Sequence, residues 1–232
     1  PVMKFSRSLW RYTRLTPTVL TLCLSLTVSV WAATPAPMPA AGSTTTASFA
    51  RLSWADDETQ VSLTGPDGRA VPARLGAILA AGSTVRTGNS GVELELVPNG
   101  SRIKLAASTT FRLSVLATAG KPGDNSFELV SGKLRMLAKP VATGQGGYEI
   151  RTASAVCAVR GTDFARQYDP EGNKDWLCVL QGLIDFSSSD GKEALLVNGG
   201  QFVSLAKGWV VETAPKAWLD TNLADIAAFR TP

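Results

Sequence analysis

Short apolar stretches separated by turn residues follow one another from Phe49 onward. In segment 92–97, VELELV, apolar and acidic residues alternate, so that Glu93 and Glu95 share the face opposite the apolar one. Turn signals such as Gly65-Pro66-Asp67-Gly68 recur about every ten residues. This pattern predicts an all-β domain of many short strands, with Glu93 and Glu95 on a solvated face.

A loose internal repeat supports this prediction. An apolar residue, two spacers and a glycine recur at Leu79–Gly82, Leu129–Gly132, Val179–Gly182 and Val197–Gly200, each time before a new apolar run. The spacing between copies is irregular, which argues against a strict solenoid. The repeat suggests a strand that turns at glycine and starts again, reused in stacked rungs or paired sheets.

The C-terminal segment has a different period. Pro215 suits the first turn of a helix, and Leu219, Leu223 and Ile226 then recur at helical spacing through Phe229. We expect one short amphipathic helix within residues 213–232, docked on the sheet or on a partner.

The stretch 148–168, YEIRTASAVCAVRGTDFARQY, is rich in β-branched and small apolar residues and contains one glycine, Gly161. Because only glycine takes positive φ without cost, the stretch is expected to form two strands joined by a sharp bend. The Arg160-Gly161-Thr162-Asp163 sequence could also be a binding site in which Arg160 holds a carboxylate. We favour the bend, with Thr162 and Asp163 satisfying backbone donors and Arg160 bracing a strand.

The N-terminal residues 1–32 are typical of a secretory signal peptide. A basic segment, 4–14, precedes an apolar run, 19–30, which ends on the small residues that signal peptidase requires. Cleavage is expected between Ala32 and Ala33. The alternative, an uncleaved inner-membrane anchor, needs about 20 apolar residues, more than this run has.

The domain plan follows from these segments. Residues 33–48 are rich in Pro, Ala and Thr and predict a disordered linker. The β domain is expected at 49–212 and the helix and tail at 213–232. After cleavage the protein would be soluble in the periplasm, without stable membrane insertion.

The amino-acid composition limits the kinds of binding and catalysis that the protein can perform. The net charge of +4 comes from four basic residues before position 15, since the other 19 basic residues balance the 19 acidic ones. The domain thus has no electrostatic footprint for nucleic acid. The chain has no histidine, the usual general base and the commonest metal ligand. We expect no catalytic residue, no metal and no cofactor.

The remaining candidates for chemistry each have two interpretations. Cys157 and Cys178 could form a disulfide in an oxidising compartment, or could be two buried thiols. Two carboxylates could act as the catalytic pair of a glycosidase, and the candidates are Asp56, Asp57, Glu58, Glu93 and Glu95. Such exposed carboxylates are usually just solvated. The tryptophans at 54, 176, 209 and 218 could bind sugar, although scattered aromatic residues in a β domain are mostly core.

The phrase TASAVCAVRGTDF, residues 152–164, resembles the signature of the FecR domain, the periplasmic domain of ferric-citrate-type transmembrane regulators. Segments 79–88, 99–105, 129–134 and 199–201 agree with the family in the same order, and the resemblance covers roughly residues 50–210. Ala153 and Asn99 replace the usual Pro and Asp. The signature residues, which we expect to be structural, are Thr152, Val159, Arg160, Gly161, Thr162 and Phe164.

The resemblance implies a compact β-sandwich or short β-helical barrel. It also implies an exported, non-enzymatic module of Gram-negative envelope signalling. Members of the family contact the signalling domain of an outer-membrane receptor and control a sigma factor through a cytoplasmic segment. Only 18 residues precede the apolar run here, so we expect action through a partner, either a receptor signalling domain or another periplasmic protein. The alternative is an envelope scaffold or a glycan-binding or peptidoglycan-binding protein. The oligomeric state stays open.

Overall fold

Seventeen β-strands and one α-helix make up most of the computed structural model, which describes residues 48–118, 124–141, 146–172 and 174–230. The predicted signal peptide at 1–32, its cleavage point between Ala32 and Ala33, and all but the last residue of the predicted linker at 33–48 lie outside these residues. No helix in the described part is long and apolar enough to cross a membrane.

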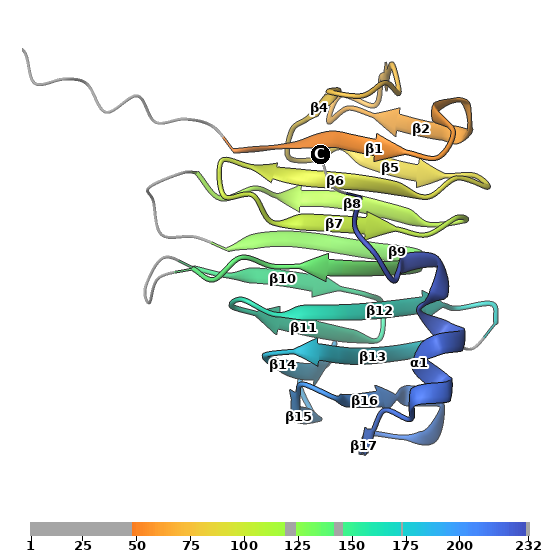
Figure 1. Cartoon of the computed structure of the whole chain (residues 1–232). Helices are drawn as coiled ribbons and strands as arrows, with labels where there is room; N and C mark the ends of the chain where they lie inside the picture. Colours follow the sequence, from red (N-terminus) through yellow and green to blue (C-terminus); the bar gives the residue numbers. More distant parts are fainter. Residues whose placement is uncertain (1–47, 119–123, 142–145, 173, 231–232) are drawn as a thin grey trace, which may run out of the picture. The chain divides into compact units, whose positions relative to one another are not determined.

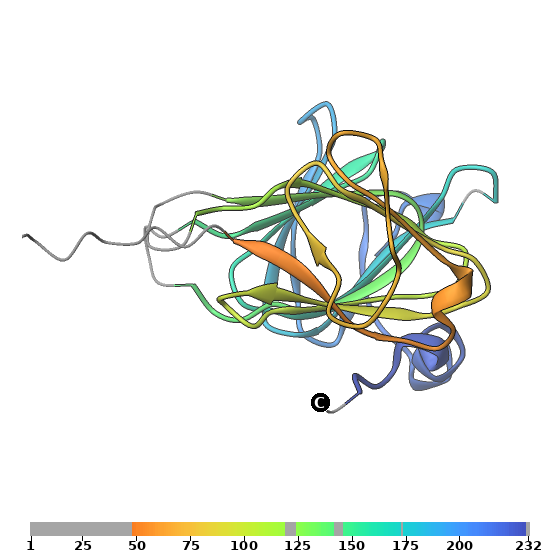
Figure 2. The same ribbon diagram turned by 90° about the horizontal axis from the view of Figure 1, so that it is seen from above.

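The strands form two layers that share one long strand, β9 (Asn125–Leu137) (Figures 1 and 2). Layer A has, in spatial order, β4 (Ile78–Leu79), β1 (Phe49–Ala55), β6 (Val92–Val97), β7 (Arg102–Leu105), the second half of β9, β12 (Asp163–Asp169), β13 (Lys174–Gln181), β16 (Gln201–Ser204) and β17 (Val211–Thr213).

Layer B has the other eight strands around the first half of β9. Its spatial order is β3 (Ala70–Val71), β2 (Val61–Thr64), β5 (Thr84–Thr87), β8 (Thr110–Val115), β9, β10 (Tyr148–Arg151), β11 (Ala155–Val159), β14 (Leu183–Ser188) and β15 (Ala194–Asn198). Every pairing is antiparallel except that of β9 with β10. The all-β prediction is confirmed, and the layers stay open rather than closing into a barrel.

The core lies between the layers, where the alternation seen in the sequence places the apolar side chains. Layer A contributes fully buried residues such as Leu94 and Phe164, and layer B contributes residues such as Phe111, Phe127 and Phe186. Full burial of each such side chain is worth roughly 1.5–3 kcal/mol. The core is therefore continuous through the whole stack.

Each glycine of the sequence repeat lies where the chain passes from one layer to the other. At Gly132 the strand β9 leaves β8 and β10 of layer B and joins β7 and β12 of layer A. Gly132 has a φ of +103°, and a Cβ at this position would lie 2.5 Å from the Cα of Thr109. Gly82, Gly182 and Gly200 of the repeat, and Gly161 outside it, mark further crossings, all with positive φ. The reused turn predicted from the repeat is thus a layer crossing.

The predicted C-terminal helix is present but ends earlier than its period indicated. Helix α1 spans Lys216–Asn222, a 3-10 turn follows at Ala224–Ile226, and the chain then continues without regular structure to Arg230. Leu223 and Ile226 are buried on the outer face of layer A. They share a cluster with Trp176, Cys178, Phe202 and Trp218.

Cys157 and Cys178, the two cysteines within the described residues, are free thiols in separate clusters. Cys157 on β11 points into the core between the layers, whereas Cys178 on β13 points to the outer face of layer A, beneath the helix. Strand β11 pairs with β10 and β14, not with β13. The hairpin around residues 169–174 joins β13 to β12, so it does not bring β13 next to β11. The structure therefore differs from the disulfide alternative.

Burial raises the pKa of both thiols to about 12. In a Cys23→Ser variant we expect no mass change on reduction and almost no reaction with a thiol reagent at pH 8 until urea is added. In the folded protein the pKa of each thiol lies above its ordinary value of 9.0. The contribution of the two neutral thiols to the stability of the fold is therefore fully present below pH 9 and is lost as the pH rises from 9 to 12. A gain of two protons on reduction, or rapid labelling of the folded protein, would contradict this arrangement.

Candidate functional site

Four side chains form a line across the outer face of layer A, one on each of four neighbouring strands. Trp54 on β1 is the cross-strand partner of Glu93 on β6, Glu93 that of Lys104 on β7, and Lys104 that of Arg135 on β9. We call these four residues the charged row. They point outward because the alternate positions on the same strands fill the core.

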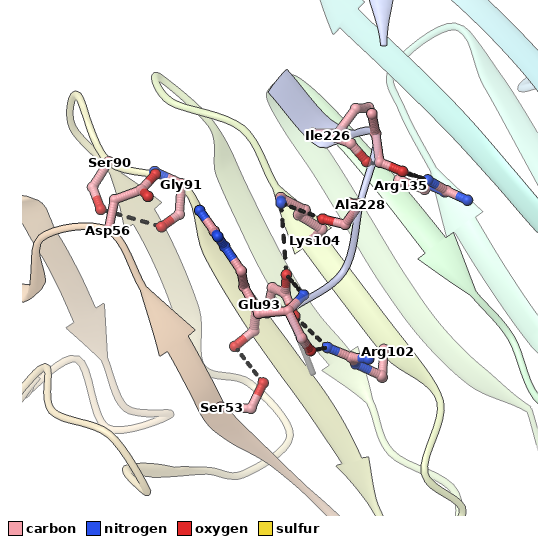
Figure 3. Close-up of polar contacts among 12 residues, drawn as sticks. Ser53, Asp56, Ser90, Gly91, Glu93, Arg102, Lys104, Arg135, Ile226 and Ala228 are labelled. Carbon is pink, nitrogen blue, oxygen red and sulfur yellow. Dashed lines mark hydrogen bonds and ion pairs between the residues drawn. The ribbon is translucent and has the colours of Figure 1, made fainter. Parts of the chain in front are cut away.

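The C-terminal segment lies over the charged row and is held mainly through its backbone (Figure 3). Four basic side chains donate hydrogen bonds to its main-chain carbonyls: Lys133 to Asn222 (2.9 Å), Arg135 to Ala227, Lys104 to Ala228 (2.5 Å) and Arg102 to Arg230. Charged donors make stronger hydrogen bonds than neutral ones. The face therefore holds the backbone of the chain's own C-terminal segment.

Glu93 is the buried centre of this contact. Its carboxylate accepts hydrogen bonds from Arg102 Nη2 at 2.5 Å and from the backbone N–H of Arg230 at 2.7 Å, and Lys104 Nζ is 3.6 Å away. The Glu93 side chain is 0% exposed, whereas Glu95 is partly exposed and pairs with Arg51. The expectation that Glu93 is solvated is therefore wrong, because the C-terminal segment covers this face.

Aromatic rings stack on the cations of the same surface. Phe229 lies between the guanidinium groups of Arg102 and Arg135, whose Cζ atoms are 4.9 and 5.4 Å from its ring centre. The ring of Trp54 contacts Lys104 and Arg230 at 5.4 and 4.8 Å. Each such contact is worth about 0.5–1 kcal/mol at an exposed site. The surface thus contacts an aromatic residue, Phe229, and the cation next to it, Arg230.

Asp163, which follows the signature glycine, is linked to the charged row. Its two carboxylate oxygens accept hydrogen bonds from Nε and Nη2 of Arg135 at 2.9 and 2.7 Å. This bidentate pair fixes the plane of the guanidinium, which in turn binds the carbonyl of Ala227 and the ring of Phe229. The bend at Gly161 therefore brings Asp163 onto the outer face of layer A.

The signature residues do not converge on one site. Thr152, Val159 and Phe164 are buried, and the Thr162 hydroxyl donates to the carbonyl of Leu183 at 2.9 Å. Gly161 has a φ of +126° at a layer crossing. Arg160 is exposed. The structural role of the signature residues stays a prediction.

Sequence reasoning missed a buried ion pair between Arg166 on β12 and Asp175 on β13. The Arg166 side chain is 0% exposed, donates to Thr152 Oγ1 at 3.2 Å, and lies over the ring of Phe186. Ser154 donates to the Asp175 carboxylate. Arg166 is two residues beyond the buried Phe164 on the same strand. Because side chains two positions apart point to the same face of a strand, the sequence could have predicted that Arg166 points into the core.

The remaining candidates have structural roles. Trp176 and Trp218 pack edge to face at 4.9 Å, and Trp209 packs on Phe186. Asp56 accepts a hydrogen bond from the backbone of Gly91 and Asp57 from that of Thr59, while Glu58 accepts one from the backbone of Leu75. In the described residues, no group of three His, Cys, Asp or Glu side chains could hold a metal ion.

Comparisons with known proteins place this geometry in context. Residues 83–185 match the model of the FecR protein family. No curated protein matches the chain. Two crystal structures of candidate anti-sigma factors from Parabacteroides distasonis are similar, with 16 and 18% identity and TM-scores of 0.48 and 0.43.

The matches to these two structures cover 60 and 53% of this chain, and 65 and 58% of theirs, less than two thirds of their length. The family match is the more informative result, because it spans β5 to β14 and contains the signature at 152–164. It also contains three members of the charged row. Residues 83–185 of this chain are a FecR domain.

Proposed function

We propose that this protein is a non-enzymatic signalling module of the cell envelope, exported to the periplasm, which acts by binding another protein. The observation that supports this most directly is the outer face of layer A, where charged side chains hold main-chain groups of the chain's own C-terminal segment. The FecR match supports a regulatory role. Either a receptor signalling domain or another periplasmic protein would be the partner.

The chemistry of the face favours a protein over a glycan. Sugars bind on exposed aromatic faces, whereas Trp176, Trp209 and Trp218 are used in internal packing and Trp54 stacks on two cations. The scaffold or peptidoglycan-binding alternative therefore has no specific contact to support it.

Site-specific photo-crosslinking in the native host tests the proposal. A photoreactive residue replaces the exposed Ala228 over layer A or, as the matched control, the exposed Arg112 on layer B. We expect one discrete protein adduct from position 228 and none from position 112. Adducts with peptidoglycan alone, or no protein adduct from either face, would overturn the proposal.

A further inference from the structure

The C-terminal segment has two parts that are held in different ways. Leu223 and Ile226 are 6 and 0% exposed and anchor the first part in the cluster beneath the helix. Beyond them, Ala227, Ala228 and Arg230 are exposed and only Phe229 is half-buried. The last four described residues can therefore leave the sheet while the anchor stays in place.

The contacts of this second part are not specific to its sequence. Lys104, Arg102 and Arg135 bind carbonyl oxygens, and Glu93 accepts a backbone N–H, groups that every polypeptide carries. Within the described residues, only two contacts of this part of the segment involve its side chains. Phe229 fits between two guanidinium groups, and Arg230 stacks on Trp54.

The surface extends further than the segment that covers it. A cavity of about 370 Å³ next to Arg230 is lined by Arg51, Trp54, Glu95 and Arg102, and a second of about 600 Å³ lies along residues 224–230. Moreover, Glu93, Lys104 and Arg135 lie within the FecR match, whereas the covering segment lies beyond it. Three of the four residues of the charged row thus belong to the matched domain, whereas Trp54 and the covering segment lie outside it.

We propose that the charged row is a peptide-binding site that residues 227–230 occupy in the free protein. A signalling partner displaces them with an extended segment of its own, in which an aromatic residue is followed by a basic one. This inference rests on the proposed function, because it names the chemistry of the partner and makes the C-terminal segment a competitor for the same site.

The test uses a fluorescent peptide with the sequence of residues 225–230, DIAAFR, and the full chain. The parent should bind it weakly, because its own segment occupies the site. Phe229→Ala removes two cation–π contacts from that segment, so we expect peptide binding to tighten about five-fold or more by fluorescence anisotropy. A peptide with Ala in place of Phe should bind the Phe229→Ala chain more weakly by the same factor.

Controls separate displacement from misfolding. Adding Lys104→Met to the Phe229→Ala chain should weaken peptide binding, whereas adding Arg112→Met, on the other layer, should not. Each variant is first shown to melt as a folded protein. Equal binding by parent and Phe229→Ala, or binding insensitive to Lys104→Met, would overturn the inference. Crosslinks to a protein from position 228 would leave the proposed function intact in that case.

Discussion

Gly132→Ala is expected to be the most damaging single substitution in the domain. A Cβ at this position would lie 2.5 and 2.7 Å from the Cα and Cβ of Thr109, and the φ of +103° disfavours any side chain. Backbone cannot move aside as a flexible side chain can. We expect a loss of about 4 kcal/mol or more, which lowers the melting temperature by roughly 10 °C or prevents folding.

Gly200→Ala is the matched control for this prediction. Gly200 also marks a layer crossing and has a φ of +82°, but a Cβ there would have no atom within 4 Å. Gly200→Ala should therefore lower the free energy of unfolding by only about 1–2 kcal/mol, the cost of placing a side chain at positive φ. Thermal unfolding followed by circular dichroism compares the two. Equal losses would show that φ, rather than the close approach to Thr109, decides the requirement for glycine.

Arg166→Met should also destabilise the protein strongly. It removes the buried guanidinium that neutralises the largely buried Asp175 and leaves that carboxylate with Ser154 as its remaining partner. Breaking a buried pair in this way typically costs about 3–5 kcal/mol. Urea unfolding at neutral pH should report this loss.

The double variant Arg166→Met/Asp175→Leu separates the two causes. Because an apolar pair of similar volume can replace a buried ion pair, it should recover most of the loss. Arg112→Met is the exposed control, since its pair with Glu128 is half solvated and worth about 0–1 kcal/mol. If the double variant were as unstable as the single one, the packing of Arg166 on Phe186 would be the main contribution.

Local patterns predicted the local structure well. The alternation at 92–97 correctly placed its apolar side chains in the core, and the glycine repeat marked real turns. The period at the C-terminus correctly predicted a helix, but the chain leaves the helix at Asn222 and later follows the charged row. Backbone contacts to Arg102, Lys104 and Arg135 compete there with helical hydrogen bonds, and no local signal reveals them.

The features that the sequence analysis missed depend on residues far apart in the chain. The hydrogen bond from Arg230 to Glu93 joins positions 137 residues apart, so nothing near Glu93 indicates that it is covered. The choice between a Cys157–Cys178 disulfide and two buried thiols stayed open for a similar reason. It required knowledge of which layer each strand enters, and that depends on the crossing at Gly161, which lies between the two cysteines in the chain.

The order of strands has a consequence for how the protein is made. In both layers, beyond the first few strands, each new strand pairs with one that precedes it in the chain, so the stack lengthens in the direction of synthesis. Such a domain can be assembled strand by strand as the polypeptide emerges, with short loop closures at each step. The C-terminal segment alone returns to the first strands, and its docking therefore marks the completion of the domain.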